Sequence, residues 1–106
     1  MEIRFIKGKA LEASAKHFNN EFNESEMVEI VRQVVNNRTH TGKSDRANPG
    51  HTPANIIWGD LYGTTYQITY DSIDIRKGLM TVVAFFDVNP QTKHRKTKRF
   101  NLKEVN

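Results

Sequence analysis

The amino-acid sequence predicts an α+β protein in which two N-terminal helices pack on a four- to five-stranded antiparallel sheet, in the order β-α-α-β-β-β-β. Apolar residues recur at helical spacing in the first third of the chain, and strand-like alternation dominates after residue 54. The length of 106 residues fits a single domain, residues 1–106. We therefore expect one hydrophobic core between the helices and the sheet.

The first strand and the first helix follow from the spacing of their apolar residues. Residues 1–6 predict a short strand, because Ile3 and Phe5 alternate with polar neighbours. Four apolar residues at spacing i, i+4, i+7 and i+11 then predict a helix that ends between Phe18 and Asn20. These four are Leu11, Ala15, Phe18 and Phe22.

The start of the second helix is the clearest local signal in the chain. Asn23 is a favourable N-cap, and Glu26 stands at the reciprocal position of a capping box. Phe22 and Met27 flank this start as a hydrophobic staple. An apolar stripe follows, so the helix is expected to end near residue 36 or 37.

The second half of the chain predicts a long polar loop and then a meander of four strands. The loop, residues 38–53, is rich in Gly, Pro, Ser, Thr and Asn and has almost no apolar residue. The four strands are expected at residues 55–58, 64–71, 79–88 and 93–105. The third of them is nearly continuously apolar, as expected for a central strand that is covered on both faces.

The composition excludes several classes of function. The chain has no cysteine, which excludes a disulfide framework, a thiolate zinc site and a cysteine nucleophile. Its formal net charge is +4, and residues 38–106 carry eleven Lys/Arg against six Asp/Glu, whereas residues 1–37 carry five against six. The longest apolar run is too short to cross a bilayer, and the N-terminus does not resemble a signal peptide. We expect a soluble, cytoplasmic protein without membrane contact.

Residues 93–99, K-H-R-K-T-K-R, form a cationic strip with five fixed positive charges in seven residues. We expect the strip to belong to the last strand and to contact the phosphates of a nucleic acid, RNA in preference to DNA. The alternative is an edge strand that Lys and Arg protect from aggregation. The expected nucleic-acid-binding residues are Arg38, Thr52, Lys93, Arg95, Lys96, Lys98 and Arg99.

Histidines in the polar loop are the candidates for acid–base chemistry. Metal-independent RNA cleavage needs a base for the 2′-hydroxyl, an acid for the leaving 5′-oxygen and cations for the charge on phosphorus. His40 and His51 can supply the first two, and Lys43 and Arg46 the third. Each histidine is alternatively an ordinary polar loop residue.

Other assignments of the polar residues are weaker. His94 is expected to contact phosphate or solvent, and His17 to lie on a helix surface. The segment 41–44, T-G-K-S, resembles the end of a P-loop, but Asn37 stands where that motif needs a glycine. The histidine spacing does not fit a metal site. We therefore expect neither a metal ion nor another cofactor.

Three stretches carry a resemblance to a known family: HFNNEFNESEMVEIVRQVVNN, TTYQITYD and LMTVVAFFDV, within residues 17–88. Their pattern resembles the barnase–EndoU–colicin–RelE group of small RNases, including its phage and toxin branches. The resemblance implies endoribonuclease activity, with site residues on the exposed face of the sheet and in the loop before it. The positions that match are His40, Lys43, Arg46, His51, Thr52 and residues 93–99. Asn20 and Glu21 stand where many relatives carry an arginine.

The leading hypothesis is thus a metal-independent endoribonuclease, a toxin or a phage-encoded nuclease, that cleaves RNA by attack of the 2′-hydroxyl. The alternative is a non-catalytic nucleic-acid-binding, accessory or inhibitor protein of a mobile element. A toxin of this kind also implies an acidic inhibitor or immunity protein as a partner. The enzymatic hypothesis requires residues 38–53 and the cationic strip to lie on the same side of the sheet.

Overall fold

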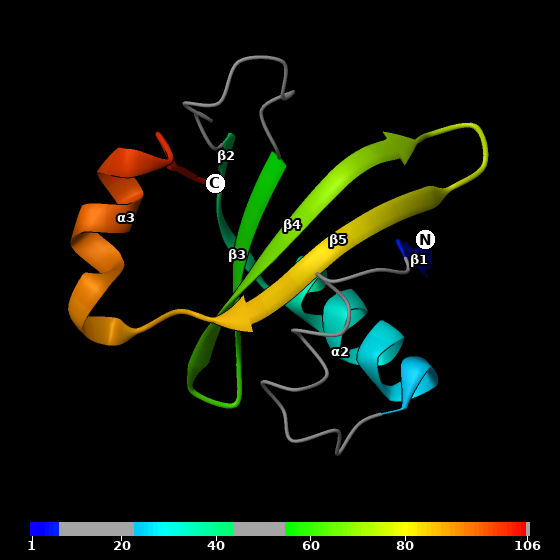
Figure 1. Cartoon of the computed structure of the whole chain (residues 1–106), viewed down its shortest axis with the longest axis horizontal. Coiled ribbons are helices and arrows are strands. Elements are labelled where there is room, and N and C mark those ends of the chain that lie inside the picture. Colours follow the sequence, from blue (N-terminus) through cyan, green and yellow to red (C-terminus); the bar gives the residue numbers. More distant parts are fainter. Residues whose placement is uncertain (7–22, 44–54, 106) are drawn as a thin grey trace.

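A computed structural model describes residues 1–6, 23–43 and 55–105 of the chain (Figure 1). Within these residues, six strands form one sheet in the order β1-β5-β4-β3-β2-β6. Its elements are β1 (Glu2–Phe5), α2 (Glu24–Asn36), β2 (Arg38–Lys43), β3 (Asn55–Leu61), β4 (Thr64–Asp74), β5 (Leu79–Asp87), η1 (Pro90–Thr92), α3 (Lys93–Arg99) and β6 (Lys103–Glu104).

The predicted architecture of two N-terminal helices on an antiparallel sheet is wrong. The sheet is mixed, because β1 runs parallel to β5 while the other neighbouring strands are antiparallel. One of the two described helices, α3, follows the strands of the meander instead of preceding them. Alternation along a strand shows which residues share a face, but it does not show which strand lies beside it or in which direction. The first predicted helix lies outside the described residues.

Two segments adopt a different secondary structure from the one predicted. Residues 93–99 form α3 and not a strand. The Asn89 side chain accepts a hydrogen bond from the Gln91 N–H at 2.9 Å, which starts the turn η1, and the Lys and Arg residues that follow are good helix formers. Residues 38–43 form strand β2 in place of the beginning of a loop. The sequence did not predict β2, because its residues are polar and show no apolar alternation, although Thr39 and Thr41 are β-branched and suit a strand.

Helix α2 begins as the sequence predicts. The Asn23 Oδ1 atom accepts a hydrogen bond from the Glu26 N–H at 2.9 Å, and the helix ends at Asn36. Its buried residues are Met27, Val31 and Val34. Strands β3, β4 and β5 also form at the predicted places, with ends that differ by a few residues.

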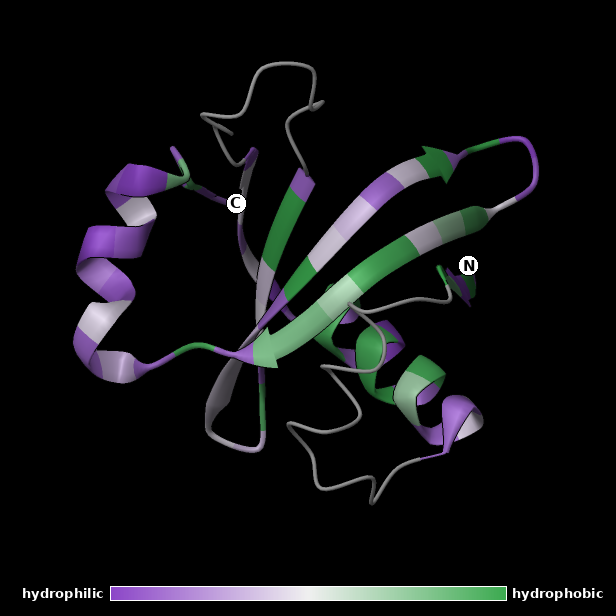
Figure 2. Ribbon diagram, in the orientation of Figure 1, coloured by the Kyte–Doolittle hydropathy of each residue, from purple (hydrophilic) through white to green (hydrophobic). Residues whose placement is uncertain are grey.

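The main hydrophobic core lies between α2 and one face of the sheet. Phe85, Ile68, Met80 and Val82 are fully buried there, and Phe5 packs beside Phe85 with ring centroids 6.3 Å apart. Figure 2 shows this core as largely hydrophobic colouring along β5 and along part of α2. Partly buried Tyr66 and Tyr70 border it, and burial raises the pKa of the Tyr70 phenol above its ordinary value.

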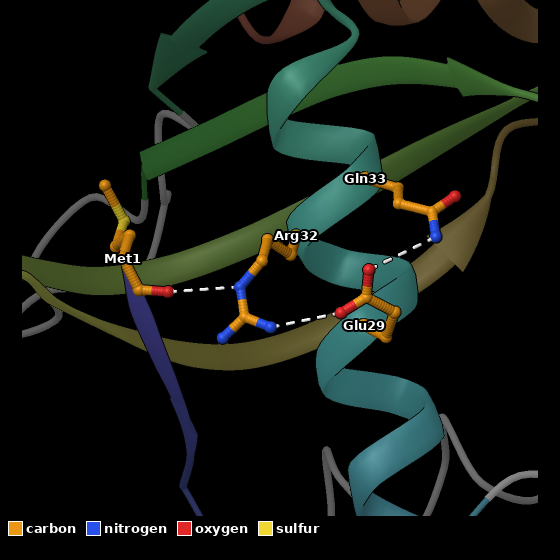
Figure 3. Close-up of polar contacts among 4 residues, drawn as sticks. All are labelled: Met1, Glu29, Arg32 and Gln33. Atoms are coloured by element: carbon orange, nitrogen blue, oxygen red, sulfur yellow. Dashed lines mark hydrogen bonds and ion pairs between the residues drawn. The ribbon is translucent and has the colours of Figure 1, made fainter.

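Polar contacts also hold α2 against β1. The Arg32 guanidinium donates from Nε to the Met1 carbonyl at 3.2 Å and from Nη1 to the Glu29 carboxylate at 3.1 Å (Figure 3). The Gln33 amide donates to the same carboxylate at 3.3 Å. Arg32 thus links the helix to the first strand across 31 residues of sequence.

A second, smaller core lies on the opposite face of the sheet. It contains Ile56, Trp58, Val88 and Leu102, with Phe100 packed against it. The segment from η1 through α3 carries the chain from β5 to β6, and α3 lies on the β2 side of the molecule (Figure 1). Neither helix of the described residues has the length and apolar character needed to cross a membrane.

Candidate active site

A pocket of about 300 Å³ lies between the first turn of α3 and the face of the sheet that carries the smaller core. Residues from β2, β3, β4 and α3 line it, so four elements that are distant in sequence meet there. The lining residues are Thr39, His40, Trp58, Asp60, Thr65, Lys93, His94 and Thr97.

His40 is half-buried on β2, directly opposite Trp58 on β3. Its ring meets the Trp58 ring edge-on, with centroids 5.7 Å apart. The His40 Nδ1 atom lies 2.9 Å from the Thr39 Oγ1 atom, and that hydroxyl donates to the Trp58 carbonyl at 3.4 Å. Whether His40 Nδ1 or Thr39 Oγ1 donates in their contact depends on the tautomer of His40. The ring's other nitrogen, Nε2, can accept a proton in the tautomer in which Nδ1 carries the hydrogen.

Trp58 forms the rigid floor beside His40. Only 2% of its surface is exposed, and its indole Nε1–H donates to the Gln67 side-chain oxygen at 3.0 Å. His40, Trp58 and Gln67 occupy consecutive strands in register, which puts their side chains on one face of the sheet. The orientation of the His40 ring is therefore fixed by both packing and hydrogen bonds.

On the other side of the pocket, a chain of hydrogen bonds joins Lys93 to Asp60. The Lys93 ammonium donates to the Thr65 hydroxyl, and this hydroxyl donates to the Asp60 carboxylate at 2.7 Å. Thr97 on α3 donates its hydroxyl to the Lys93 carbonyl at 2.8 Å. The half-buried Lys93 thus extends from α3 toward the sheet, and its positive charge lies at the pocket.

His94 is the second imidazole of the pocket. It follows Lys93 in the first turn of α3 and is exposed, so its ring can exchange protons with solvent. The strand prediction placed Lys93 and His94 on opposite faces. In a helix, residues at spacing i, i+3 and i, i+4 are neighbours, so Thr97 lies beside both His94 and Lys93. Recognition of the helix would therefore have identified His94 as a site residue.

Four further cationic side chains lie on α3, outside the lining of the pocket. Arg95, Lys98 and Arg99 are exposed and Lys96 is half-buried, and Arg99 lies over the Phe100 ring at 5.4 Å from its centroid. Figure 2 shows α3 as predominantly hydrophilic, in contrast to β5. This arrangement suits a polyanion that runs along α3 and enters the pocket.

Two other predicted site residues among the described ones, Arg38 and Lys43, do not line this pocket. Arg38 donates from Nη1 to the Val35 carbonyl at 3.1 Å, which satisfies the C-terminal end of α2. Lys43 is exposed at the far end of β2, opposite Asn55. Three further predicted residues, Arg46, His51 and Thr52, lie outside the described residues. In the part of residues 38–53 that the structure describes, His40 lies on the same side of the sheet as α3.

A larger pocket of about 390 Å³ lies on the opposite side, between α2 and the turn that joins β3 to β4. Among the described residues, its lining includes Ile30, Leu61 and Tyr66 with the carboxylates Glu26 and Glu29, and no lysine, arginine or histidine. Because carboxylates repel phosphates, the smaller pocket is the better candidate for phosphate chemistry. Among the described residues, no group of three or more His, Asp or Glu is placed to hold a metal ion.

Comparisons with protein-family models, with curated proteins and with solved structures find no match to this chain. The features that point to a function are therefore the geometry of the pocket and the positive charge of α3.

Proposed function

We propose that the protein is an endoribonuclease that cleaves RNA by transphosphorylation, without a metal ion, in the pocket beneath α3. The supporting observation is that two imidazoles and one ammonium group, from His40, His94 and Lys93, line the same pocket of about 300 Å³. These are the groups that such a reaction requires: a base, an acid and a cation for the phosphate. The resemblance to the barnase–EndoU–colicin–RelE group is consistent with this activity and suggests a toxin or phage-encoded nuclease.

In the proposed reaction, His40 is the general base. In the tautomer in which Nδ1 donates to Thr39, its Nε2 atom accepts the proton of the 2′-hydroxyl. The 2′-oxygen then forms a bond to phosphorus. The substrate provides this nucleophile, so no nucleophilic side chain is needed.

His94 is the general acid. As an imidazolium it gives a proton to the 5′-oxygen while the bond between phosphorus and that oxygen breaks. The products are a 2′,3′-cyclic phosphate and a free 5′-hydroxyl. Lys93 stabilises the negative charge on the phosphoryl oxygens, and the exposed cations of α3 hold the adjacent backbone phosphates.

The test is incubation of the purified protein with a defined RNA oligonucleotide in EDTA. Cleavage that yields a 2′,3′-cyclic phosphate is expected, together with no cleavage where the 2′-hydroxyl is replaced by hydrogen. His40→Ala and His94→Ala should each lower kcat by about 10²- to 10⁴-fold. Lys77→Ala, which removes an exposed cation of the β4–β5 turn, is the control and should leave kcat unchanged.

Absence of cleavage by the wild-type protein, or full activity of both histidine variants, would contradict the enzymatic proposal. The second candidate function is RNA binding without cleavage, which the five fixed charges of α3 favour independently of the histidines. Binding that weakens steeply with salt and is insensitive to both histidine substitutions would select it. An acidic inhibitor protein that covers α3 is compatible with either function.

A further inference from the structure

We infer that Thr65 is a positioning residue that holds the Lys93 ammonium in the pocket by linking it to Asp60. This inference extends the proposed function, in which Lys93 binds the phosphate. Thr65 is the one polar side chain that is buried among the described residues, with 7% of its surface exposed. A buried hydroxyl needs partners, and here both partners are charged groups.

The direction of the two hydrogen bonds fits a bridge between opposite charges. The Lys93 ammonium donates to the Thr65 oxygen, and the Thr65 hydrogen points to the Asp60 carboxylate 2.7 Å away. Each bond polarises the hydroxyl in the sense that strengthens the other. The bridge attracts the ammonium toward the sheet without bringing the carboxylate into direct contact with it.

This arrangement leaves the ammonium able to bind a phosphate. A lysine ammonium has three N–H donors, and Thr65 accepts from one of them. A direct ion pair with Asp60 would place a competing anion beside the substrate phosphate. The neutral hydroxyl between them links Lys93 to Asp60 through two hydrogen bonds in place of a direct ion pair, and all three residues line the pocket.

Backbone hydrogen bonds also hold Thr65 in position. It lies opposite Asp60 in the β3–β4 ladder, and its carbonyl accepts a hydrogen bond from the Val88 N–H at 2.8 Å. Val88 precedes η1 and α3, so Thr65 contacts the chain just before the helix that carries Lys93. The Thr65 hydroxyl is therefore well placed to fix the position of the Lys93 ammonium group.

The experiment compares Thr65→Val, which keeps the shape and removes the hydroxyl, with Thr65→Ser, which keeps the hydroxyl. In single-turnover cleavage of RNA, Thr65→Val should lower the rate by about 10- to 100-fold, whereas Thr65→Ser should stay within about threefold of wild type. Asp60→Asn, at an exposed position, should give a loss between these two. Thermal unfolding of each variant establishes that it is folded.

A second measurement separates this inference from the proposed function. Titration of each protein with inorganic phosphate, followed by NMR of the pocket amides and of the Lys93 side-chain nitrogen, requires no cleavage. Thr65→Val should bind phosphate about 10-fold more weakly and shift the Lys93 nitrogen signal, and Thr65→Ser should restore both. If wild type fails to cleave RNA, the proposed function fails while this titration still decides the role of Thr65. Equal phosphate affinity in wild type, Thr65→Val and Asp60→Asn would overturn the inference.

Discussion

The two faces of the sheet differ in what their side chains do. On the α2 face, fully buried residues such as Ile68 and Phe85 fill a continuous core, and the adjoining pocket is acidic at its rim. On the α3 face the core is small, and a polar pocket with two imidazoles lies beside it. We therefore expect the core on the α2 face to contribute most of the free energy of folding. Substitution of the charged and polar residues on the α3 face should change the stability little.

The largest effect is expected from a cavity on the α2 face. Ile68→Ala should lower the free energy of unfolding by about 4 kcal/mol, because Ile68 is fully buried and its loss leaves a void. Ile68→Val should cost about 1 kcal/mol. Chemical denaturation measures both values, and RNA cleavage per folded molecule should be unchanged.

Stability and activity are separable only if the histidine variants behave in the opposite way, with lower activity and nearly unchanged stability. His40→Ala and His94→Ala should alter the free energy of unfolding by less than about 1 kcal/mol, since neither side chain is fully buried. A large loss of stability in the histidine variants, or a large loss of specific activity in folded Ile68→Ala, would show that the two faces are not independent.

Two glycines, one on each face of the sheet, allow the stability of the two faces to be compared directly, with smaller expected effects. A Cβ atom on Gly59 would lie 2.1 Å from the Val34 carbonyl oxygen, so α2 approaches the sheet too closely for any side chain there. A Cβ atom on Gly42 would lie 2.7 Å from Leu102 Cδ2 and 2.8 Å from the Phe100 carbonyl oxygen, where the segment after α3 packs. Gly59→Ala is expected to cost about 3 kcal/mol and Gly42→Ala about 1 kcal/mol.

The difference between these two values has a structural reason. At Gly59 the nearest atom is the Val34 carbonyl oxygen at 2.1 Å, which belongs to the backbone of α2, whereas at Gly42 the nearest atom is in the Leu102 side chain at 2.7 Å and the backbone oxygens of Phe100 and Asn101 lie at 2.8 and 3.0 Å. Denaturation curves give the two costs, and the phosphate titration reports whether Gly42→Ala also moves the pocket. A higher cost at Gly42 than at Gly59 would contradict the assignment of stability to the α2 face.

The sequence predicted those parts of the fold that depend on neighbouring residues. The start of α2 depends on Asn23 and Glu26, which are three residues apart, and it forms as expected. The strands β3, β4 and β5 also depend on local patterns, which are alternation for β4 and a nearly continuous apolar run for β5. The partner of β1 depends on residues almost eighty positions away, since Ile3 pairs with Met80. No local pattern contains that information.

The difference between local and long-range information also explains which residues of the candidate site the sequence predicted. His40 was identified because histidine titrates near neutral pH, and the structure places it in the pocket. Asp60 and Thr65 were missed, because an isolated carboxylate and a threonine in a strand gain significance only when Lys93 lies beside them. Helix α3 was missed because it has no apolar stripe, so its seven residues show no hydrophobic periodicity.

The smallest predicted effect concerns the exposed charges of α3. The double substitution Arg95→Ala/Lys98→Ala removes two exposed cations of α3. If both contact phosphates of a single-stranded RNA, the slope of log binding constant against log salt concentration should become shallower by about 1.4. Fluorescence anisotropy at several salt concentrations, with a substrate whose reactive 2′-hydroxyl is absent, measures this slope.

The matched control is Arg76→Ala/Lys77→Ala, which removes the same charge from the exposed β4–β5 turn. Its slope should equal that of the wild type, because counterions are released only where a phosphate is contacted. Equal changes in both double variants would mean that RNA responds to net charge over the whole surface. A change confined to the α3 variant would instead show that the backbone follows this helix, which is the path that leads a phosphate to Lys93.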